Sequence, residues 1–360
     1  MPESVYIHIP FCKSKCKYCS FVSIVKTGFI EDYISALIRE IENNYSGETL
    51  KTLYFGGGTP SLLSVEFVKK IMNNFNISSQ TEITFEINPD DAEPDYLKWL
   101  RDVGINRLSF GVQTFDDKIL DLIGRRHNSK QVLKAIEAAK KAGFENLSVD
   151  LIYGLPEQTL ETLEKDLETI KALDIQHVST YGLKIEEPSY FYYHPIDVPD
   201  ADIQADMYLG INNYLENIGF KRYEISNFAR AGFESKHNLN YWNNNEYYGF
   251  GAAAHGYKDG IRYSNTENLE EYIKNPLKHL TEYLVTTNEK LEEEIFLGFR
   301  REKGINIEEM NKKFDIDFES KYQNILTKYM PKYLIKTDIG YKFTLDGVLL
   351  SNNILADFID

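Results

Sequence analysis

The stretch VYIHIPFCKSKCKYC, residues 5–19, joins a β-rich run to a loop that contains all three cysteines of the 360-residue chain. The β-branched and aromatic residues between Val5 and Ile9 predict a strand. Cys12, Cys16 and Cys19 follow within eight residues, which excludes a disulfide framework spread over the fold. Their clustering indicates metal ligation or redox chemistry in a reducing compartment.

The three thiolates are one ligand fewer than a closed four-iron cubane requires. One iron of such a cluster would stay open for a ligand that the protein does not supply. A tetrahedral zinc site is the alternative, and it would need a fourth protein ligand. His8, in the preceding strand, is a candidate for that position.

Strand-like runs alternate with amphipathic helical segments through the first two thirds of the chain. Strands are expected at residues 5–9, 52–55, 83–87, 107–112, 147–153 and 177–183, and helices at residues 30–44, 64–75, 129–142 and 159–173. This alternation predicts an α/β fold with a parallel sheet. Six units are too few for a closed eight-stranded barrel, so we expect a partial (β/α)6, TIM-like barrel with its site at the C-terminal ends of the strands.

The length of the chain favours a large domain with a smaller partner. We assign residues 1–230 to the barrel, residues 231–290 to a connecting region and residues 291–360 to a small C-terminal α+β domain of winged-helix type. Capping of the barrel is the alternative role for the last segment. Residues 223–263 are rich in Tyr, Asn and Gly without regular periodicity, and they are expected to form a functional loop.

The composition, with 42% hydrophobic and 26% charged residues, is that of a globular protein. A formal net charge of −15 argues against broad nucleic-acid binding, which needs a clustered excess of Lys and Arg. No run approaches the roughly 20 apolar residues of a membrane span, and the N-terminal residues lack the layout of a signal peptide. We therefore expect a cytoplasmic protein without a membrane span.

The CxxxCxxC spacing of the cysteines resembles the signature of the radical S-adenosylmethionine (SAM) superfamily, in which an aromatic residue such as Tyr18 packs near SAM. This resemblance implies a [4Fe-4S] cluster on Cys12, Cys16 and Cys19 whose open iron binds SAM. One electron from the reduced cluster would then cleave the sulfonium of SAM to methionine and a 5'-deoxyadenosyl radical. Residues 56–60, GGGTP, look like the glycine motif that holds the methionine part of SAM.

The resemblance is closer to one branch and extends over most of the chain. The segments YIHIPFC, FGGGTPS, EINP, SFGVQTF and DLIYGLP resemble the oxygen-independent coproporphyrinogen III oxidase group. Polar residues at successive strand ends suit a ribose, an adenine edge and an ammonium group. The SAM contacts that the resemblance implies are Tyr6, Gly57, Gly58, Thr59, Glu86, Gln113, Arg125 and Asp150.

Two features favour the HemW branch of this group over the true oxidases. The oxidases carry another cysteine two positions after the third ligand, where this chain has Phe21. Residues 237–242, HNLNYW, match the HNxxYW motif of the HemW branch. This resemblance implies heme as a further cofactor, and a neutral imidazole is the commonest protein ligand of heme iron.

His237 is accordingly the candidate heme ligand, although a histidine at such a place can also cap a helix or hydrogen-bond within a loop. His255 is a further candidate, and Arg222 or Arg230 could bind the heme propionates. The function expected from the resemblance is that of a heme chaperone, which passes heme to an acceptor protein not identified by the sequence.

No catalytic side chain is assigned under the chaperone hypothesis, and the chain is expected to be a monomer or a cluster-dependent dimer. The alternative is an oxygen-independent coproporphyrinogen III oxidase, which decarboxylates two propionates of its substrate. A radical SAM enzyme acting on an unrelated substrate is the third possibility, but it would not explain the match that runs from Tyr223 to Trp242.

Overall fold

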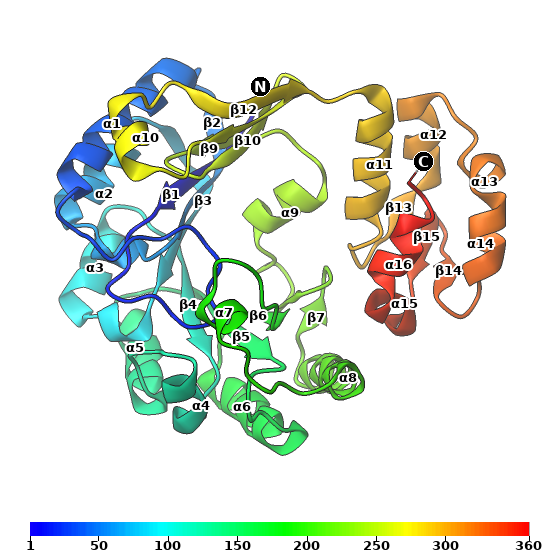
Figure 1. The fold of residues 1–360 in the computed structure, drawn as a ribbon, viewed down its shortest axis with the longest axis horizontal. Helices are drawn as coiled ribbons and strands as arrows, with labels where there is room; N and C mark the ends of the chain where they lie inside the picture. The colour runs from blue at the N-terminus through cyan, green and yellow to red at the C-terminus, as the bar shows by residue number, and fades with distance from the viewer. Residues whose placement is uncertain (360) are drawn as a thin grey trace.

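The computed structural model describes residues 1–359 and is built around one nine-stranded sheet with the strand order β7-β8-β6-β5-β4-β3-β2-β1-β9. Strands β1 to β6 run parallel in sequence order, which confirms the predicted βα arrangement. Their bounds are β1 (Ser4–Ile9), β2 (Thr49–Gly57), β3 (Asn76–Ile87), β4 (Arg107–Gln113), β5 (Asn146–Tyr153) and β6 (His177–Gly182). Figure 1 shows the strands as a curved sheet that stays open on one side.

Helices cover the outer face of this sheet (Figure 1). They are α1 (Ile30–Asn44), α2 (Val65–Met72), α3 (Pro94–Asp102), α4 (Asp117–Leu122), α5 (Ser129–Lys141), α6 (Leu160–Leu173) and α8 (Ala201–Asn217), with 3-10 turns η1 (Pro60–Leu62) and η2 (Pro89–Asp91). Val5, Ile7 and Ile9 of β1 are fully buried in the core between the sheet and the helices. Because side chains alternate along a strand, Tyr6 and His8 face the inside of the barrel.

Short elements extend the sheet at both edges where the sequence shows no periodicity. β7 (Lys221–Arg222) and β8 (Asn227–Ala229) are antiparallel additions beyond β6, and β9 (Tyr248–Phe250) pairs in parallel with β1. Between them lies α9 (Lys236–Trp242). Residues 223–263, expected to form a loop, thus contain regular structure, and the prediction was wrong because elements of three to seven residues are too short to show a period.

A second, three-stranded antiparallel sheet follows, formed by β10 (His255–Lys258), β11 (Ile261–Asn265) and β12 (His279–Leu284). The helix within this segment, α10 (Leu269–Lys274), packs against α1. The buried carboxyl of Glu40 on α1 accepts hydrogen bonds from Asn265 and Tyr272 at 2.6 and 2.5 Å. These contacts fix the second sheet to the barrel.

The C-terminal part forms its own α+β unit beside the open side of the barrel (Figure 1). Its elements are α11 (Thr287–Gly298), β13 (Ile305–Asn306), α12 (Ile307–Phe314), α13 (Phe318–Lys321), α14 (Gln323–Tyr329), β14 (Leu334–Lys336), β15 (Gly340–Phe343), α15 (Leu345–Leu349) and α16 (Ser351–Ala356). A separate apolar cluster that includes Phe299, Phe318 and Phe358 holds the unit together, and Tyr208 of α8 joins it. Within residues 1–359, none of the helices combines the length and apolar character needed to cross a membrane.

Candidate functional site

A cavity of about 600 Å³ opens at the C-terminal ends of the parallel strands and lies in the size range of ligand pockets. All three cysteines line it, together with every predicted SAM contact except Tyr6. The residues that it brings together are Cys12, Cys16, Cys19, Gly57, Gly58, Thr59, Glu86, Gln113, Arg125 and Asp150. Side chains from six consecutive βα units thus meet in one space, as parallel strands require.

Backbone hydrogen bonds hold the cysteine loop in place. The N–H of Cys12 donates to the carbonyl of Ile24 at 3.0 Å, and the N–H of Ile24 donates to the carbonyl of Pro10 at 2.6 Å. Farther along, the N–H of Lys17 donates to Ile123 at 2.9 Å. The loop is therefore anchored at its base and in its middle, and its thiols stay at the cavity.

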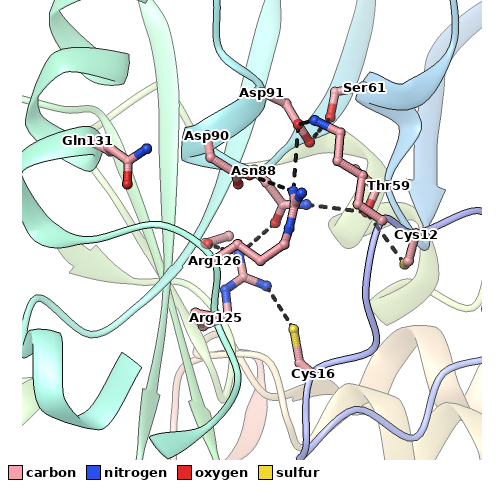
Figure 2. A network of polar contacts seen from close by, with 12 residues as sticks. Cys12, Cys16, Thr59, Ser61, Asn88, Asp90, Asp91, Arg125, Arg126 and Gln131 are labelled. Carbon is pink, nitrogen blue, oxygen red and sulfur yellow. Dashed lines mark hydrogen bonds and ion pairs between the residues drawn. The ribbon is translucent and has the colours of Figure 1, made fainter. Parts of the chain in front are cut away.

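Two of the sulfurs accept contacts from side chains in the segments that follow β2 and α4 (Figure 2). The hydroxyl of Thr59 donates to Cys12 Sγ at 3.4 Å, and Nη1 of Arg125 donates to Cys16 Sγ at 3.4 Å. A cation and a hydroxyl beside the sulfurs stabilise thiolates, the form that binds iron. This donor set fits an iron-sulfur cluster with cysteine ligands.

The geometry is less suited to the zinc alternative. Within residues 1–359, no three His, Cys, Asp or Glu side chains converge as ligands of a single metal ion. In a cubane, by contrast, each thiolate binds a different iron atom. His8, the candidate fourth zinc ligand, has both ring nitrogens engaged, Nδ1 with the Tyr6 hydroxyl at 3.1 Å and Nε2 with the Val22 carbonyl at 3.2 Å.

The glycine motif after β2 permits a close approach of three chain segments. Gly57 has a φ of +108°, and the N–H of Gly58 donates to the carbonyl of Ile9 at 2.8 Å. A Cβ at Gly58 would lie 2.7 Å from the carbonyl oxygen of Phe11 and 3.1 Å from Cys12 Sγ. Only glycine fits here without moving the cysteine loop.

Two carboxyl groups stand on the cavity wall. Glu86 accepts hydrogen bonds from the Tyr54 hydroxyl at 2.7 Å and from the N–H of Gly57 at 3.2 Å. Burial, together with the neighbouring Asp150, raises the pKa of Glu86 to about 7 against the hydrogen bond from Tyr54. Burial also raises the pKa of Asp150, against hydrogen bonds from Ser179 and Ser109. A cationic ligand such as a sulfonium would stabilise both groups in their ionised form.

Arg125 is the centre of a polar network under the cysteine loop (Figure 2). Its Nη2 donates to Oδ1 of Asn88 and to the carbonyl of Gly111, both at 2.5 Å. Asn88 in turn donates to the Thr59 hydroxyl at 3.2 Å. Gln113, at the end of the neighbouring strand, has a φ of +73°, an unusual conformation that commonly marks a functional position.

A second network ties the cysteine loop to η2 and was missed by sequence reasoning. Lys13 forms an ion pair with Asp91, which also accepts a hydrogen bond from Ser61 at 3.0 Å. Arg126 forms an ion pair with Asp90 at 2.5 Å (Figure 2). The signal for these residues is their position: Asp90 and Asp91 directly follow the EINP segment, and Arg126 follows Arg125.

Tyr6 lies apart from the other predicted SAM contacts. Its side chain faces the barrel interior but is not part of the cavity wall. The hydroxyl contacts His8, and the ring lies beside those of Tyr54 and His237. The position six residues before Cys12 is too far from the strand end to reach the cavity in this conformation.

His237, the candidate heme ligand, does not line the cavity. The residue is 1% exposed. Its Nδ1 lies 2.8 Å from the Thr52 hydroxyl, and its Nε2 lies 2.9 Å from the Tyr241 hydroxyl. The ring stacks on Tyr54 with centroids 4.8 Å apart. With both nitrogens engaged, His237 joins α9 to β2, which is the structural role weighed as the alternative.

Gly58→Ala tests the close approach at the cysteine loop. We expect the variant to retain less than about half of the iron and of the cluster absorbance of the wild type after anaerobic reconstitution, because the added Cβ displaces Phe11 and Cys12. Gly28→Ala is the matched control, since nothing lies within 4 Å of a Cβ at that position. Equal iron contents in both variants would contradict this account.

His237→Gln tests the burial of the imidazole. Burial lowers the pKa of His237 from 6.5 to about 3, with a further contribution from the Arg107 charge. A neutral buried imidazole stabilises the fold above pH 6.5, and this stability is lost as the pH falls toward 3. Relative to the variant, the wild type should lose about 2 kcal/mol of unfolding free energy between pH 7 and pH 5 in urea titrations.

Thr52→Val serves as the control for this measurement, because it removes a hydrogen-bond partner but leaves the imidazole to titrate. Its pH dependence should therefore follow the wild type. A difference between wild type and His237→Gln that is the same at pH 7 and pH 5 would argue against a buried neutral imidazole.

Family models match two parts of the chain. Residues 6–170 match the radical SAM superfamily, and residues 285–350 match the HemN C-terminal domain. Among solved structures, coproporphyrinogen III oxidase (HemN) from Escherichia coli, described as a radical SAM enzyme, has a similar fold with a TM-score of 0.87. The match covers 99% of this chain and 90% of that structure at 23% sequence identity, and at this identity it establishes the fold alone.

Similarity to curated relatives is higher. Heme chaperone HemW from Bacillus subtilis is 40% identical over 99% of this chain and 99% of its own length. Heme chaperone HemW from Lactococcus lactis is also 40% identical, over 99% of this chain and 97% of that protein. Because this similarity spans both the cysteine loop and the C-terminal unit, the chain belongs to the HemW family within the radical SAM superfamily.

Proposed function

We propose that this protein is a heme chaperone, which binds heme, a [4Fe-4S] cluster and SAM and passes the heme to an acceptor protein. The observation that carries the proposal is the full-length similarity to heme chaperone HemW from two organisms at 40% identity. The match includes residues 223–242 as well as the barrel, so it covers the segment that sequence analysis associated with heme. We further propose that it acts in the cytoplasm, where its thiols stay reduced.

Membership in the radical SAM superfamily implies a [4Fe-4S] cluster and SAM. In our proposal Cys12, Cys16 and Cys19 hold the cluster, which supplies one electron for cleavage of the SAM sulfonium when both are bound. Thr59 and Arg125, which already contact the sulfurs, position two of the three thiolates.

The SAM contacts that we propose differ in the part of SAM that each can bind. Gly57 and Gly58 line the cavity, and because they have no side chains of their own a ligand can come close to their backbone. Arg125 offers a guanidinium for a carboxylate, the pairing for which its geometry is best suited. Glu86, Gln113 and Asp150 offer oxygen acceptors for an ammonium group and ribose hydroxyls. Tyr6 would have to act through His8, with which its hydroxyl is in contact.

A heme site needs a ligand for the iron, and a histidine can serve only if the heme can reach it. The seven histidines of the chain differ in how far they are buried. His8, His127, His177 and His237 are buried. His279 is half-buried and contacts Glu282. His194 and His255 are exposed, and in our proposal one of these two is the iron ligand.

A coproporphyrinogen III oxidase is the second candidate, favoured by the fold shared with HemN. Against it stands Phe21, which is 68% exposed beside the third cysteine and lines the cavity. A phenyl ring there cannot ligate iron or transfer a proton, as the additional cysteine of the oxidases could. The chaperone proposal needs no such group, and it assigns no side chain as catalytic.

Heme titration of the anaerobically reconstituted protein tests the proposal. We expect saturable one-site binding followed by the Soret band. His194→Ala or His255→Ala, made separately, should weaken the binding at least tenfold when the true ligand is removed, while His237→Ala should change it less than threefold. The absence of a Soret change in the wild type, together with decarboxylation of coproporphyrinogen III, would contradict the chaperone and support the oxidase.

A further inference from the structure

Arg107 lies on the cavity wall, and one of its N–H groups has no hydrogen-bond partner. It begins β4, is only 2% exposed and is the largest of the fully buried side chains. Its Nε is buried without a hydrogen-bond partner, and its charge lowers the pKa of the nearby carboxyls of Asp150 and Glu86. A buried N–H group without a partner is destabilising, so a ligand that accepts a hydrogen bond from Arg107 would stabilise the site.

The position of Arg107 sets it apart from the SAM contacts. Because side chains alternate along a strand, Arg107, Ser109, Gly111 and Gln113 of β4 face the cavity in turn. Arg107 lies six residues before Gln113, about 20 Å along the strand at roughly 3.3 Å per residue. It therefore stands at the floor of the cavity, whereas Arg125 stands at the cysteine end, in contact with Cys16.

The Arg107 charge acts on two imidazoles and two carboxyls. Burial, and after it the Arg107 charge, lowers the pKa of both His177 and His237, so these imidazoles are neutral. Glu86 accepts hydrogen bonds from Tyr54 and Gly57. Asp150 accepts one from Ser109 at 3.1 Å. The Arg107 charge acts on both carboxyls and lowers their pKa values against the effect of burial. The floor of the cavity thus holds a buried cation with an unsatisfied Nε, beside two carboxyls that take their hydrogen bonds from other groups.

We propose that Arg107 binds a carboxylate of the bound ligand, specifically a heme propionate that reaches the floor of the cavity. This inference rests on the proposed function as a heme chaperone. A guanidinium binds a carboxylate through two parallel hydrogen bonds, and in a water-poor site this pairing is strong. The SAM carboxylate is the other source of the same chemistry, but Arg125 already serves the end of the cavity where the cluster and SAM lie.

The cavity wall around Arg107 supports a second ligand. Hydroxyl groups of Ser179, Tyr181 and Ser226 line the side formed by β6 and β8, and Asn238 of α9 closes it. Tyr181, Ser226 and Asn238 can complete the hydrogen bonds of a carboxylate held by Arg107, whereas the Ser179 hydroxyl already donates to Asp150. Asn238 belongs to the HNLNYW segment, which therefore meets the ligand through its asparagine rather than through the buried His237.

The test compares heme with heme dimethyl ester, in which both propionates are uncharged. Reconstituted wild type should bind heme at least tenfold more tightly than the ester, measured by Soret titration. Arg107→Gln should lose that preference, with heme affinity reduced tenfold or more and ester affinity within threefold of wild type. Arg101→Gln, a surface arginine on α3, is the matched control and should keep the preference.

Two outcomes would overturn the inference while leaving the chaperone function intact: equal affinities of the wild type for heme and its ester, or an Arg107→Gln variant that binds heme like the wild type. Loss of SAM affinity in Arg107→Gln with unchanged heme affinity would assign the arginine to SAM and also overturn it. Should Arg107→Gln fail to fold, the wild-type titrations still test the inference, because equal affinities for heme and its ester would overturn it. A wild type that binds neither porphyrin would overturn the proposed function as well.

Discussion

The parallel pairing of β1 with β2 is the constraint on which the site depends. It sets Ile9 opposite Gly57, so that the chain leaves β1 toward the cysteines at the place where the glycine motif leaves β2. The hydrogen bond from Gly58 to Ile9 closes this arrangement at 2.8 Å. A side chain at Gly58 would collide with the cysteine loop. Cys12 can therefore occupy its position only because residue 58 is a glycine.

Charge is arranged in layers along the cavity. At the cysteine end, Arg125 and the Thr59 hydroxyl face the sulfurs, where negative charge accumulates when thiolates bind iron. In the middle, Glu86 and Asp150 have raised pKa values because they are buried, and a cationic ligand would return them to the ionised state. At the floor, Arg107 offers positive charge again. Such an alternation suits a ligand set in which an anionic cluster, a cation and a carboxylate follow one another.

Much of the barrel could be predicted from the sequence because each strand and long helix has a pattern of apolar residues within its own segment. Each of the six parallel strands is a run of apolar residues followed by an amphipathic helix, and β1 leads directly into the cysteines. The glycine motif and the polar strand ends were predictable for the same reason, since the carboxyl ends of parallel strands share one edge. The short strands β7, β8 and β9 were not, because their pairing depends on contacts distant in sequence.

Burial was the property that the sequence did not reveal. His237 lies in a motif associated with heme, yet Thr52 and Tyr241 engage both of its ring nitrogens. Tyr6 precedes the cysteines at the expected spacing but lies outside the cavity wall. Arg107 shows the converse, since nothing in its surroundings in the sequence distinguishes it from a surface arginine at the start of a strand. In each case the decisive contacts come from other strands.

Electron paramagnetic resonance of the reduced, reconstituted protein with and without SAM tests the central claim most directly, namely that three cysteines leave one iron of the cluster open toward the cavity. The account predicts a [4Fe-4S] signal whose g-values change when SAM is added, because the ligands of the open iron change. A signal that is identical with and without saturating SAM would contradict it, since the cluster would then have no open iron within reach of the ligand.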